Sequence, residues 1–471
     1  MTLLTQLREI VGDTHVLTDA ETAKYDHDWT GKYQATPIAV VRPVSTQDVS
    51  DIVKICAAAK TAIVPVSGNT SLAGGTYGKD AVMISMERMN DIREIRPDAR
   101  IAIVGAGAVL SSIHDAADAH DLVFPLTFGA KGSAMIGGAL STNAGGSNVV
   151  RYGSTRGLCL GLEVVLPDGQ IMNLMSELHK DNSGYDLKNL MIGAEGTLGL
   201  ITSAVLKLFP KPRAYATAMV AVPAFPDALR LLNDLQAATG GLVEAFEYMD
   251  ALYIADHLTM FPKARAPFED KHDINIMVEV GATAPNMTDL QPDGTIPLVT
   301  LLEGTLGQMM EDGRVVDAVV AQNDAQRREM WERREAAGEV MLLRKTMINN
   351  DICVPVDKVD DFFEHIDARL AELDPKALHS SVSHLGDGNI HFLLFPTKDD
   401  AQHIDILTEA VEDVVLSLGG SFSAEHGIGL TKKPSMARRK DKVALAVMRS
   451  VKAAIDPDNI MNPGKVLPQT N

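Results

Sequence analysis

The sequence predicts an α+β protein of more than one domain, and three observations favour this fold class. The chain has 471 residues, too many for one ordinary hydrophobic core and enough for about three domains. Near its start, β-rich apolar runs alternate with a helical pattern. After the segment FPKPR the pattern changes to the mixed strands and helices of an α+β domain. We therefore expect a domain boundary at residue 212.

The first part of the chain begins with an amphipathic helix that ends at Gly12. A strand at 37–43, a helix at 45–60 and a strand at 61–66 form a β-α-β unit. From residue 98 to about 212, short apolar runs are separated by glycines. The second part mixes strands and helices. We expect strands at 214–225, 243–250, 274–280 and 351–356, and helices at 226–239, 323–343 and 401–418.

Composition excludes several classes of function. No apolar run approaches the about 20 residues that a membrane-spanning helix needs. The net charge of −19 argues against binding to nucleic acid or to an anionic membrane surface. The start of the chain resembles neither a secretory signal nor a transit peptide. The three cysteines, Cys56, Cys159 and Cys353, form no metal or redox motif, which is typical of reduced thiols in a cytoplasmic protein.

Two histidines flank a turn in SVSHLGDGNIHFLLFP, residues 381–396. An Asp-Gly pair between apolar runs predicts a β-hairpin. With Asp387 and Gly388 as the two loop residues, His384 lies directly opposite His391, and their Cβ atoms are about 5 Å apart. Two imidazoles this close can bind one metal ion. The alternative is a hairpin that merely carries two polar residues, and we favour the metal site.

A third candidate ligand follows in SFSAEHGIG, residues 421–429. Glu425 adds a carboxylate to the two imidazoles. Three protein ligands that leave open positions are typical of a catalytic metal rather than a structural one. Zinc is our first expectation, and manganese and iron(II) also fit this donor set.

Glycine-rich segments follow the predicted strands of the first part, as in PVSGNTSLAGGTYG, residues 65–78. Small residues let the backbone approach a ligand, and successive N–H groups can bind an anion. No P-loop is present, and IVGAGAVL lacks the third glycine of a dinucleotide fingerprint, where Leu110 stands. Any one such run is explained by turns alone. Three of them indicate a long ligand with a phosphate group.

Together these motifs resemble one known family. HLGDGNIH, AEHGIG and NPGK (462–465) resemble the C-terminal signature of the FAD-linked D-2-hydroxyacid dehydrogenases. That group includes D-lactate, glycolate and D-2-hydroxyglutarate dehydrogenases and has the vanillyl-alcohol oxidase type of FAD-binding fold. SGNTSLAGG, GGALSTNAGGSNVVRYGSTRG and GAEGTLGLIT resemble its FAD-binding segments. The resemblance runs from about residue 35 to 466, with the motifs in the family's order.

The resemblance implies a specific domain organisation. Residues 1–212 are expected to form an FAD-binding domain of two α/β subdomains. Residues 213–420 are expected to form an α+β substrate-binding domain with an antiparallel sheet, and residues 421–471 to return to the FAD site.

It also implies FAD that is not covalently bound, because Asn69 stands where relatives with covalent flavin have a histidine. The residues expected to contact FAD are Pro65, Ser67, Gly68, Asn69, Thr70, Ser71, Thr127, Gly132, Ser133, Gly137, Asn143, Gly145, Gly146, Glu195, Gly196, Ile201 and Asn462.

The implied reaction is oxidation of a D-2-hydroxyacid to the 2-oxoacid by hydride transfer to flavin. A metal ion at His384, His391 and Glu425 would bind the substrate hydroxyl and one carboxylate oxygen. His426 matches the family's candidate general base, with a hydrogen-bonding role outside the ligand shell as the alternative.

Two further residues are expected to meet the substrate. Arg334, three residues after Trp331, matches the family's carboxylate-binding arginine, whose planar fork grips a carboxylate. Asn389 either contacts the substrate or only shapes the turn.

The expected substrate is D-2-hydroxyglutarate first, and D-lactate or another small D-2-hydroxyacid is the alternative. By our alignment, the D-2-hydroxyglutarate enzymes have a hydroxyl residue where Gly338 stands and a lysine where Asn349 stands. Arg344 or Lys345 is expected to compensate, or else the substrate is smaller. A metal-dependent hydrolase or lyase, or an FAD-binding subunit without catalysis, is the alternative of another class. The electron acceptor is an electron-transfer flavoprotein, a quinone or a cytochrome, and a homodimer is one option for assembly.

Overall fold

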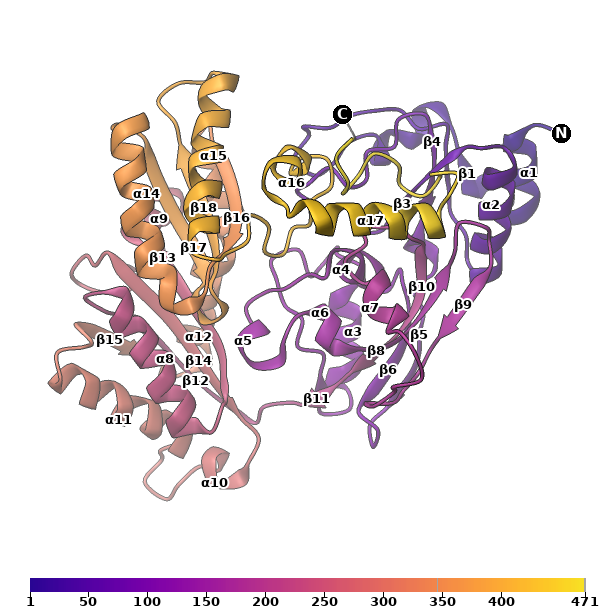
Figure 1. The fold of residues 1–471 in the computed structure, drawn as a ribbon. Helices are drawn as coiled ribbons and strands as arrows, with labels where there is room; N and C mark the ends of the chain where they lie inside the picture. Colours follow the sequence, from indigo (N-terminus) through magenta and orange to yellow (C-terminus); the bar gives the residue numbers. More distant parts are fainter. Residues whose placement is uncertain (345, 470–471) are drawn as a thin grey trace.

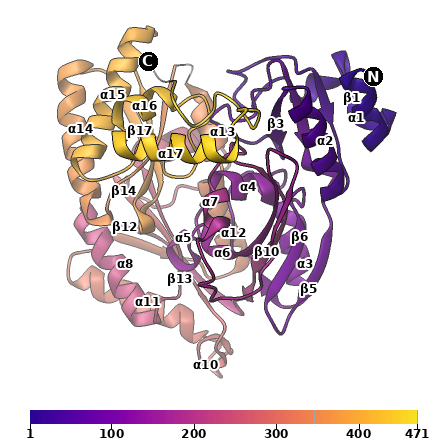
Figure 2. The same ribbon diagram turned by 45° about the vertical axis from the view of Figure 1, so that its right-hand side comes forward.

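The computed structural model describes residues 1–344 and 346–469, and Lys345 lies outside them. The strands of the described residues form four sheets. Figure 1 shows that residues up to about 210 form one half of the molecule and that residues 214–417 form the other. The last helices lie against the first half, so the two ends of the chain share that half (Figures 1 and 2).

The first sheet contains the expected β-α-β unit. Its four strands run in the order β1-β2-β4-β3, and β2 and β3 both pair in parallel with β4. Helix α2 connects β2 to β3, and the Ser45 side chain caps its first turn by accepting the Asp48 N–H. This part of the expectation is confirmed. The elements are α1 (Leu3–Val11), β1 (Val16–Leu17), β2 (Ala39–Val41), α2 (Thr46–Ala58), β3 (Ala62–Val66) and β4 (Ala81–Ser85).

The second sheet is antiparallel throughout, which differs from the α/β subdomain that we expected. Its strand order is β5-β6-β10-β8-β9. Adjacent strands are joined partly by short turns, which suit antiparallel pairing and not parallel crossovers. Helices α3 and α4 pack on this sheet through apolar side chains such as Leu110 and Ile136. The elements are β5 (Ile92–Arg96), β6 (Ile101–Gly105), α3 (Leu110–Asp118), α4 (Ile136–Thr142), β8 (Cys159–Val165), β9 (Ile171–Leu174) and β10 (Leu200–Lys207).

The third large sheet confirms the antiparallel sheet expected in the second half. Its strand order is β15-β12-β14-β13-β17-β18-β16, and every pair is antiparallel. The strands are β12 (Ala214–Ala221), β13 (Val243–Asp250), β14 (Ile274–Ala282), β15 (Asp317–Val320), β16 (Ile348–Cys353), β17 (Leu378–His384) and β18 (Asn389–Phe395).

Helices cover both faces of this sheet. On one face, side chains such as Val220 and Ile276 pack against a layer of four helices. On the other face, Met249 and Val382 pack against a second layer. The first layer is α8 (Phe225–Thr239), α11 (Pro297–Glu311), α14 (Val359–Leu373) and α15 (Ala401–Ser417), and the second contains α9 (Ala251–Met260) and α12 (Asp324–Glu335).

Two expected boundaries are wrong in detail. The charged helix expected at 323–343 ends at Glu335, and a short helix α13 (Ala337–Val340) follows it. Gly338 lies just beyond the break and favours helix less than other residues. The strand expected at 351–356 starts earlier, as β16, and ends before Pro355, which has no N–H to donate to a ladder.

The C-terminal segment returns to the first half of the molecule after α16 (Lys433–Arg439) and α17 (Lys442–Ile455). Met461 forms a parallel bridge with Ile63 of β3. Asn462 Nδ2 donates to the backbone oxygen of Gly75 at 3.1 Å. The end of the chain therefore contacts β3 and the first glycine-rich segment. Across 1–344 and 346–469, no helix is both long and apolar enough to cross a membrane.

Candidate active site

The hairpin that carries the two histidines has a different register from the one we expected. Strand β17 ends at His384 and β18 starts at Asn389, and these two residues pair. Residues 385–387 form a 3-10 turn, and Gly388 has a φ of +81°. His391 therefore faces Val382, and our register was wrong by two residues. A shift of two keeps the side chains on the same face, so the imidazoles remain neighbours, with ring centroids 5.3 Å apart.

The three expected metal ligands come together. The ligand atoms of His384, His391 and Glu425 all lie within 4.8 Å of one another. His384 Nε2 is 3.4 Å from Glu425 Oε1. Two imidazole nitrogens and one carboxylate oxygen fit a catalytic zinc site, and imidazole with carboxylate also suits manganese and iron(II).

Glu247 is a buried carboxylate that the sequence analysis missed. It lies directly opposite His384 on the neighbouring strand β13, and both of its oxygens are 2.9 Å from His384 Nδ1. A histidine that binds a metal usually donates its other N–H to such a carboxylate. Burial alone would raise the pKa of Glu247, but the charges of His384 and Arg334 hold that pKa below its usual range.

Arg334 reaches the same carboxylate from helix α12. Its Nε donates to Glu247 Oε2 at 2.6 Å, and its Nη2 is 3.3 Å from His384 Nδ1. Glu247 therefore bonds both the expected metal ligand and the arginine expected to bind the substrate carboxylate. Removing one partner from such a buried pair costs about 3–5 kcal/mol because the other charge stays buried.

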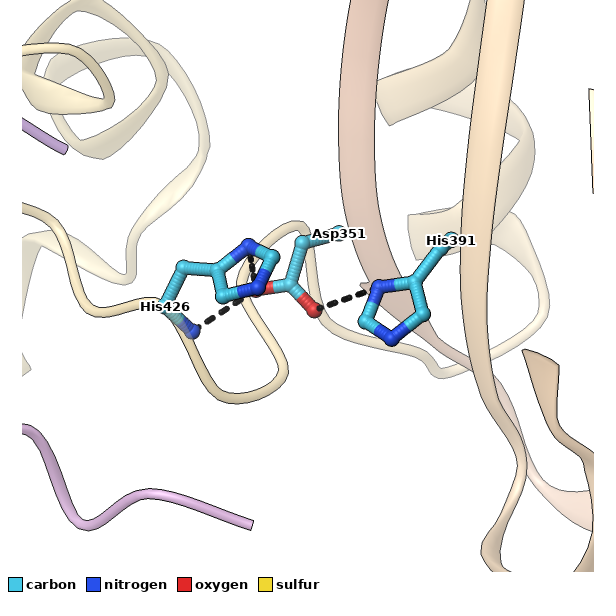
Figure 3. A group of neighbouring side chains, drawn as sticks. All are labelled: Asp351, His391 and His426. Atoms are coloured by element: carbon cyan, nitrogen blue, oxygen red, sulfur yellow. Dashed lines mark hydrogen bonds and ion pairs between the residues drawn. The ribbon is translucent and has the colours of Figure 1, made fainter. Parts of the chain in front are cut away.

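His391 has its own carboxylate neighbour, Asp351, directly opposite on β16. Figure 3 shows Asp351 between His391 and His426, with its carboxylate directed at both rings. His426 Nδ1 is 3.4 Å from Asp351 Oδ2, and the two imidazole rings stack with centroids 5.5 Å apart. Burial, followed by the charges of His384 and His426, lowers the pKa of His391 well below its usual range, which favours the neutral ring that a metal requires.

Asp351, His391 and His426 also form a group with metal-binding geometry. The carboxylate of Asp351 is already occupied, because Lys432 Nζ donates to it at 3.1 Å and Asn389 Nδ2 donates at 3.1 Å. The charges of His426, Lys432 and His391 outweigh the effect of burial and hold the pKa of Asp351 well below its usual range. The Glu425 carboxylate, in contrast, accepts no hydrogen bond from the described residues. The group that contains Glu425 is therefore the better candidate for the metal.

Asn389 braces this site. Its Nδ2 also donates to the backbone oxygen of Ile352 at 2.9 Å, so the amide holds Asp351 and the end of β16 together. Its Oδ1 is buried and has no hydrogen-bond partner among the described residues. Its bonds show the structural role that we considered, and contact of the free Oδ1 with the substrate stays a prediction.

The segments expected to bind FAD meet one another. A Cβ at Gly68 would lie 2.2 Å from the backbone oxygen of Ser133, so the first and second glycine-rich segments touch through their backbones. A Cβ at Gly146, which has a φ of +139°, would lie 2.2 Å from the Thr127 oxygen. These close approaches explain why glycine is required at both positions.

The remaining contacts continue the same surface. Gly196, with a φ of +71°, packs against the ring of Pro65. Asn462 Nδ2 donates to the Glu195 backbone oxygen at 2.8 Å, and its Oδ1 is buried without a partner among the residues that the structure describes. A Cβ at Gly145 would lie 3.5 Å from the Glu425 carboxylate. The FAD segments therefore adjoin the candidate metal site, and their small residues and free acceptor fit a bound cofactor.

Not every expected FAD residue offers its side chain. Ile201 packs in the core of the second sheet. Asn143 has a φ of +51° at the end of α4, and its Oδ1 accepts the Arg156 N–H at 2.9 Å. Asn69 bonds His27 and Thr76. Other residues expected to contact FAD differ in burial: Ser67, Thr70 and Ser71 are half-buried, Gly132 and Ser133 are exposed, and Gly137 is buried.

We expect Gly68→Ala to lower the FAD content of the purified protein, because the new methyl group forces the two FAD segments apart. The ratio of flavin to protein absorbance measures this loss. Gly129→Ala is the matched control, since a Cβ there meets no atom within 4 Å. Full flavin content and an unchanged melting temperature in Gly68→Ala would contradict the assignment of this segment.

Known proteins match the chain over both halves. Residues 37–175 match the family described as "FAD binding domain", and residues 211–466 match "FAD linked oxidases, C-terminal domain". D-2-hydroxyglutarate dehydrogenase of Stutzerimonas stutzeri is 33% identical over 473 residues, covering 98% of each chain. The mitochondrial enzyme of that name from Bos taurus is 34% identical over 460 residues, covering 96% of this chain and 81% of the relative.

Solved structures with lower identity share the fold. Alkyldihydroxyacetonephosphate synthase matches with a TM-score of 0.72 at 16% identity, covering 98% of this chain and 86% of that one. p-Cresol methylhydroxylase with bound substrate matches with a TM-score of 0.73 at 15% identity, covering 100% of this chain and 97% of that one. At this identity the likeness concerns the fold alone.

Proposed function

The chain belongs to the family of FAD-linked oxidases that includes the D-2-hydroxyglutarate dehydrogenases, and from this premise we propose that it oxidises D-2-hydroxyglutarate to the 2-oxoacid. It is an FAD-dependent oxidoreductase with the vanillyl-alcohol oxidase type of fold. One observation carries the proposal. Glu425 lies beside Gly145 of an FAD segment, within reach of His384 and His391, and Arg334 lies next to His384.

When bound, FAD would supply a hydride acceptor. A divalent metal ion, zinc first, would supply a Lewis acid for the hydroxyl group. The protein's own residues orient the substrate and move its proton. Arg334 binds the carboxylate next to the reacting carbon. His426 faces Asp351 through Nδ1, which leaves Nε2 to accept the hydroxyl proton.

A smaller D-2-hydroxyacid such as D-lactate is a second candidate, and two observations favour it. A Cβ at Gly338, where our alignment places a hydroxyl residue in the D-2-hydroxyglutarate enzymes, meets no atom of the described residues within 4 Å. Arg344, which we expected to compensate, already bonds Asp256 with Nη2 at 2.9 Å from Oδ2. A second carboxylate would have to compete with Asp256 for this arginine.

The first experiment is an anaerobic visible spectrum of the purified FAD-loaded protein before and after adding excess D-2-hydroxyglutarate. We expect the flavin band to bleach. Bleaching by D-lactate alone would favour the smaller substrate, and no bleaching by any D-2-hydroxyacid would contradict the proposed function. The rate at which the flavin band returns, when the reduced protein is mixed with an electron-transfer flavoprotein, a quinone or a cytochrome, identifies the acceptor.

Arg334→Lys provides a variant for the same experiment. Lysine keeps the charge but lacks the planar fork, so we expect a higher substrate concentration for half-maximal bleaching. Arg328→Lys is the matched control, because Arg328 is exposed on the same helix. Equal behaviour of the two variants would remove Arg334 from the substrate site.

A further inference from the structure

The loop at 424–429 carries Glu425 and His426, and a buried carboxylate holds its first half. Asp351 Oδ2 accepts the backbone N–H of Glu425 at 3.1 Å and that of His426 at 2.9 Å. Lys432 Nζ bonds both Asp351 Oδ2 and Ser423 Oγ, at 3.1 and 3.0 Å. The backbone N–H groups of Glu425 and His426 are therefore tied to strand β16 of the seven-stranded sheet.

A second buried carboxylate, from the first half of the molecule, holds the other end of this loop. Glu195 accepts the N–H of Ile428 at 2.7 Å and that of Gly429 at 2.8 Å. Gly427 lies directly on this carboxylate, since a Cβ there would be 2.8 Å from Glu195 Oε1. Gly429 lies even closer to the backbone oxygen of Ala73, which would be 2.1 Å from a Cβ at that position.

These bonds hold four backbone N–H groups of the loop by charged acceptors. The loop also makes neutral bonds: Ala424 N–H donates to the Asp351 backbone oxygen, and the Gly427, Ile428 and Gly429 oxygens accept from Ser423 Oγ, Lys432 N–H and Val466 N–H. Residues 424–429 lie outside the helices and strands of the structure, so no ladder fixes their backbone. Converging N–H groups bind a carboxylate strongly, and bonds to a charged acceptor are stronger than neutral ones. Asp351 is 1% exposed and Glu195 is 9% exposed, so water cannot readily replace either carboxylate.

We propose that Glu195 and Asp351 are positioning residues that together hold the 424–429 loop across the two halves of the molecule and so fix Glu425 and His426. The roles of Glu425 and His426 rest on the proposed function, but the attachment of the loop does not. Because the loop is short, we expect release of either end to loosen the whole loop.

Hydrogen–deuterium exchange of the full-length FAD-loaded protein tests this proposal at the four bonded amides. In Glu195→Gln, one of the two oxygens that accept a loop N–H becomes an NH₂ group. In Asp351→Asn, the single oxygen that accepts both of the other N–H groups either loses its charge or is replaced by NH₂. We expect exchange to rise about tenfold or more at all four amides in either variant, since a bond to a charged group contributes that factor. Glu195→Gln should thus affect Glu425 and His426, which it does not touch.

Asp374→Asn is the matched control. Asp374 is also buried and accepts a backbone N–H, from Thr397 at 2.9 Å, but it does not contact the loop. Its substitution should leave loop exchange unchanged. Acceleration confined to the amides that each substituted carboxylate bonds, or none at all, would overturn the proposal. This result does not depend on which substrate the enzyme oxidises.

The kinetics of the double variant provide a second test. If both carboxylates act by holding one loop, the double variant should lower kcat by little more than the stronger single variant. Flavin reduction that falls by the product of the two single effects would overturn joint positioning. A substrate that fails to reduce flavin in the wild type, with the exchange result intact, would refute the proposed function and leave the loop attachment standing.

Discussion

Replacing His391 by alanine should release the divalent metal ion that we propose at this site. It should also lower kcat by more than about 100-fold, the largest loss expected for a residue that contacts a ligand but not the metal. The reason is the donor set: without His391, only His384 and Glu425 remain, and two ligands rarely hold a catalytic metal ion. Metal content by mass spectrometry and steady-state rates measure the two effects. Flavin content should stay unchanged, because no hydrogen bond or ion pair joins His391 to the FAD segments among the described residues.

His379→Ala is the matched control for this variant. His379 lies on β17 of the same hairpin but pairs with Asp367, at 2.8 Å, on the opposite side of the sheet from the site. We expect it to keep its metal and its activity. If His391→Ala lost its metal and remained fully active, the metal would have no part in catalysis. Wild-type protein that binds no divalent ion at all would refute the metal site itself.

The residues that the sequence identified share one property, namely that their signal is local. His384 and His391 lie in one hairpin, and Glu425 and His426 lie in one short motif. The Asp-Gly pair predicted the hairpin but not its register, because residues 385–387 form a 3-10 turn instead of extending the strands. The error left the face of both histidines unchanged, since side-chain direction repeats every two residues.

The residues that the sequence did not identify depend on contacts between distant segments. Glu247 meets His384 across 137 positions because β13 is the neighbour of β17 in the sheet, and a single sequence does not report strand order. The available signal was the pair of glutamates, Glu244 and Glu247, among the apolar residues of β13. Glu195 was expected to contact FAD, and the expected return of the C-terminal segment did not indicate that the 424–429 loop would bond its carboxylate.

Replacing His426 by alanine should lower kcat by about 10²–10⁴-fold, the usual contribution of a general base. His426 is placed for this role by Asp351, which bonds its backbone N–H and faces Nδ1, while the imidazole stacks on His391. Metal and flavin content should be unchanged, because His426 is neither one of the three proposed metal ligands nor one of the residues expected to contact FAD. The primary deuterium isotope effect at the reacting carbon should rise as the chemical step becomes rate-limiting.

Added imidazole distinguishes a base from a residue that only hydrogen-bonds nearby groups. A free imidazole that occupies the space left by His426→Ala restores a proton acceptor, so part of the lost kcat should return in proportion to its concentration. A role in ordering the loop would not be restored in this way, because Asp351 holds the loop through backbone N–H groups that alanine keeps. A loss of less than about tenfold, below the usual range for a general base, would make His426 a supporting residue and assign the proton to another acceptor.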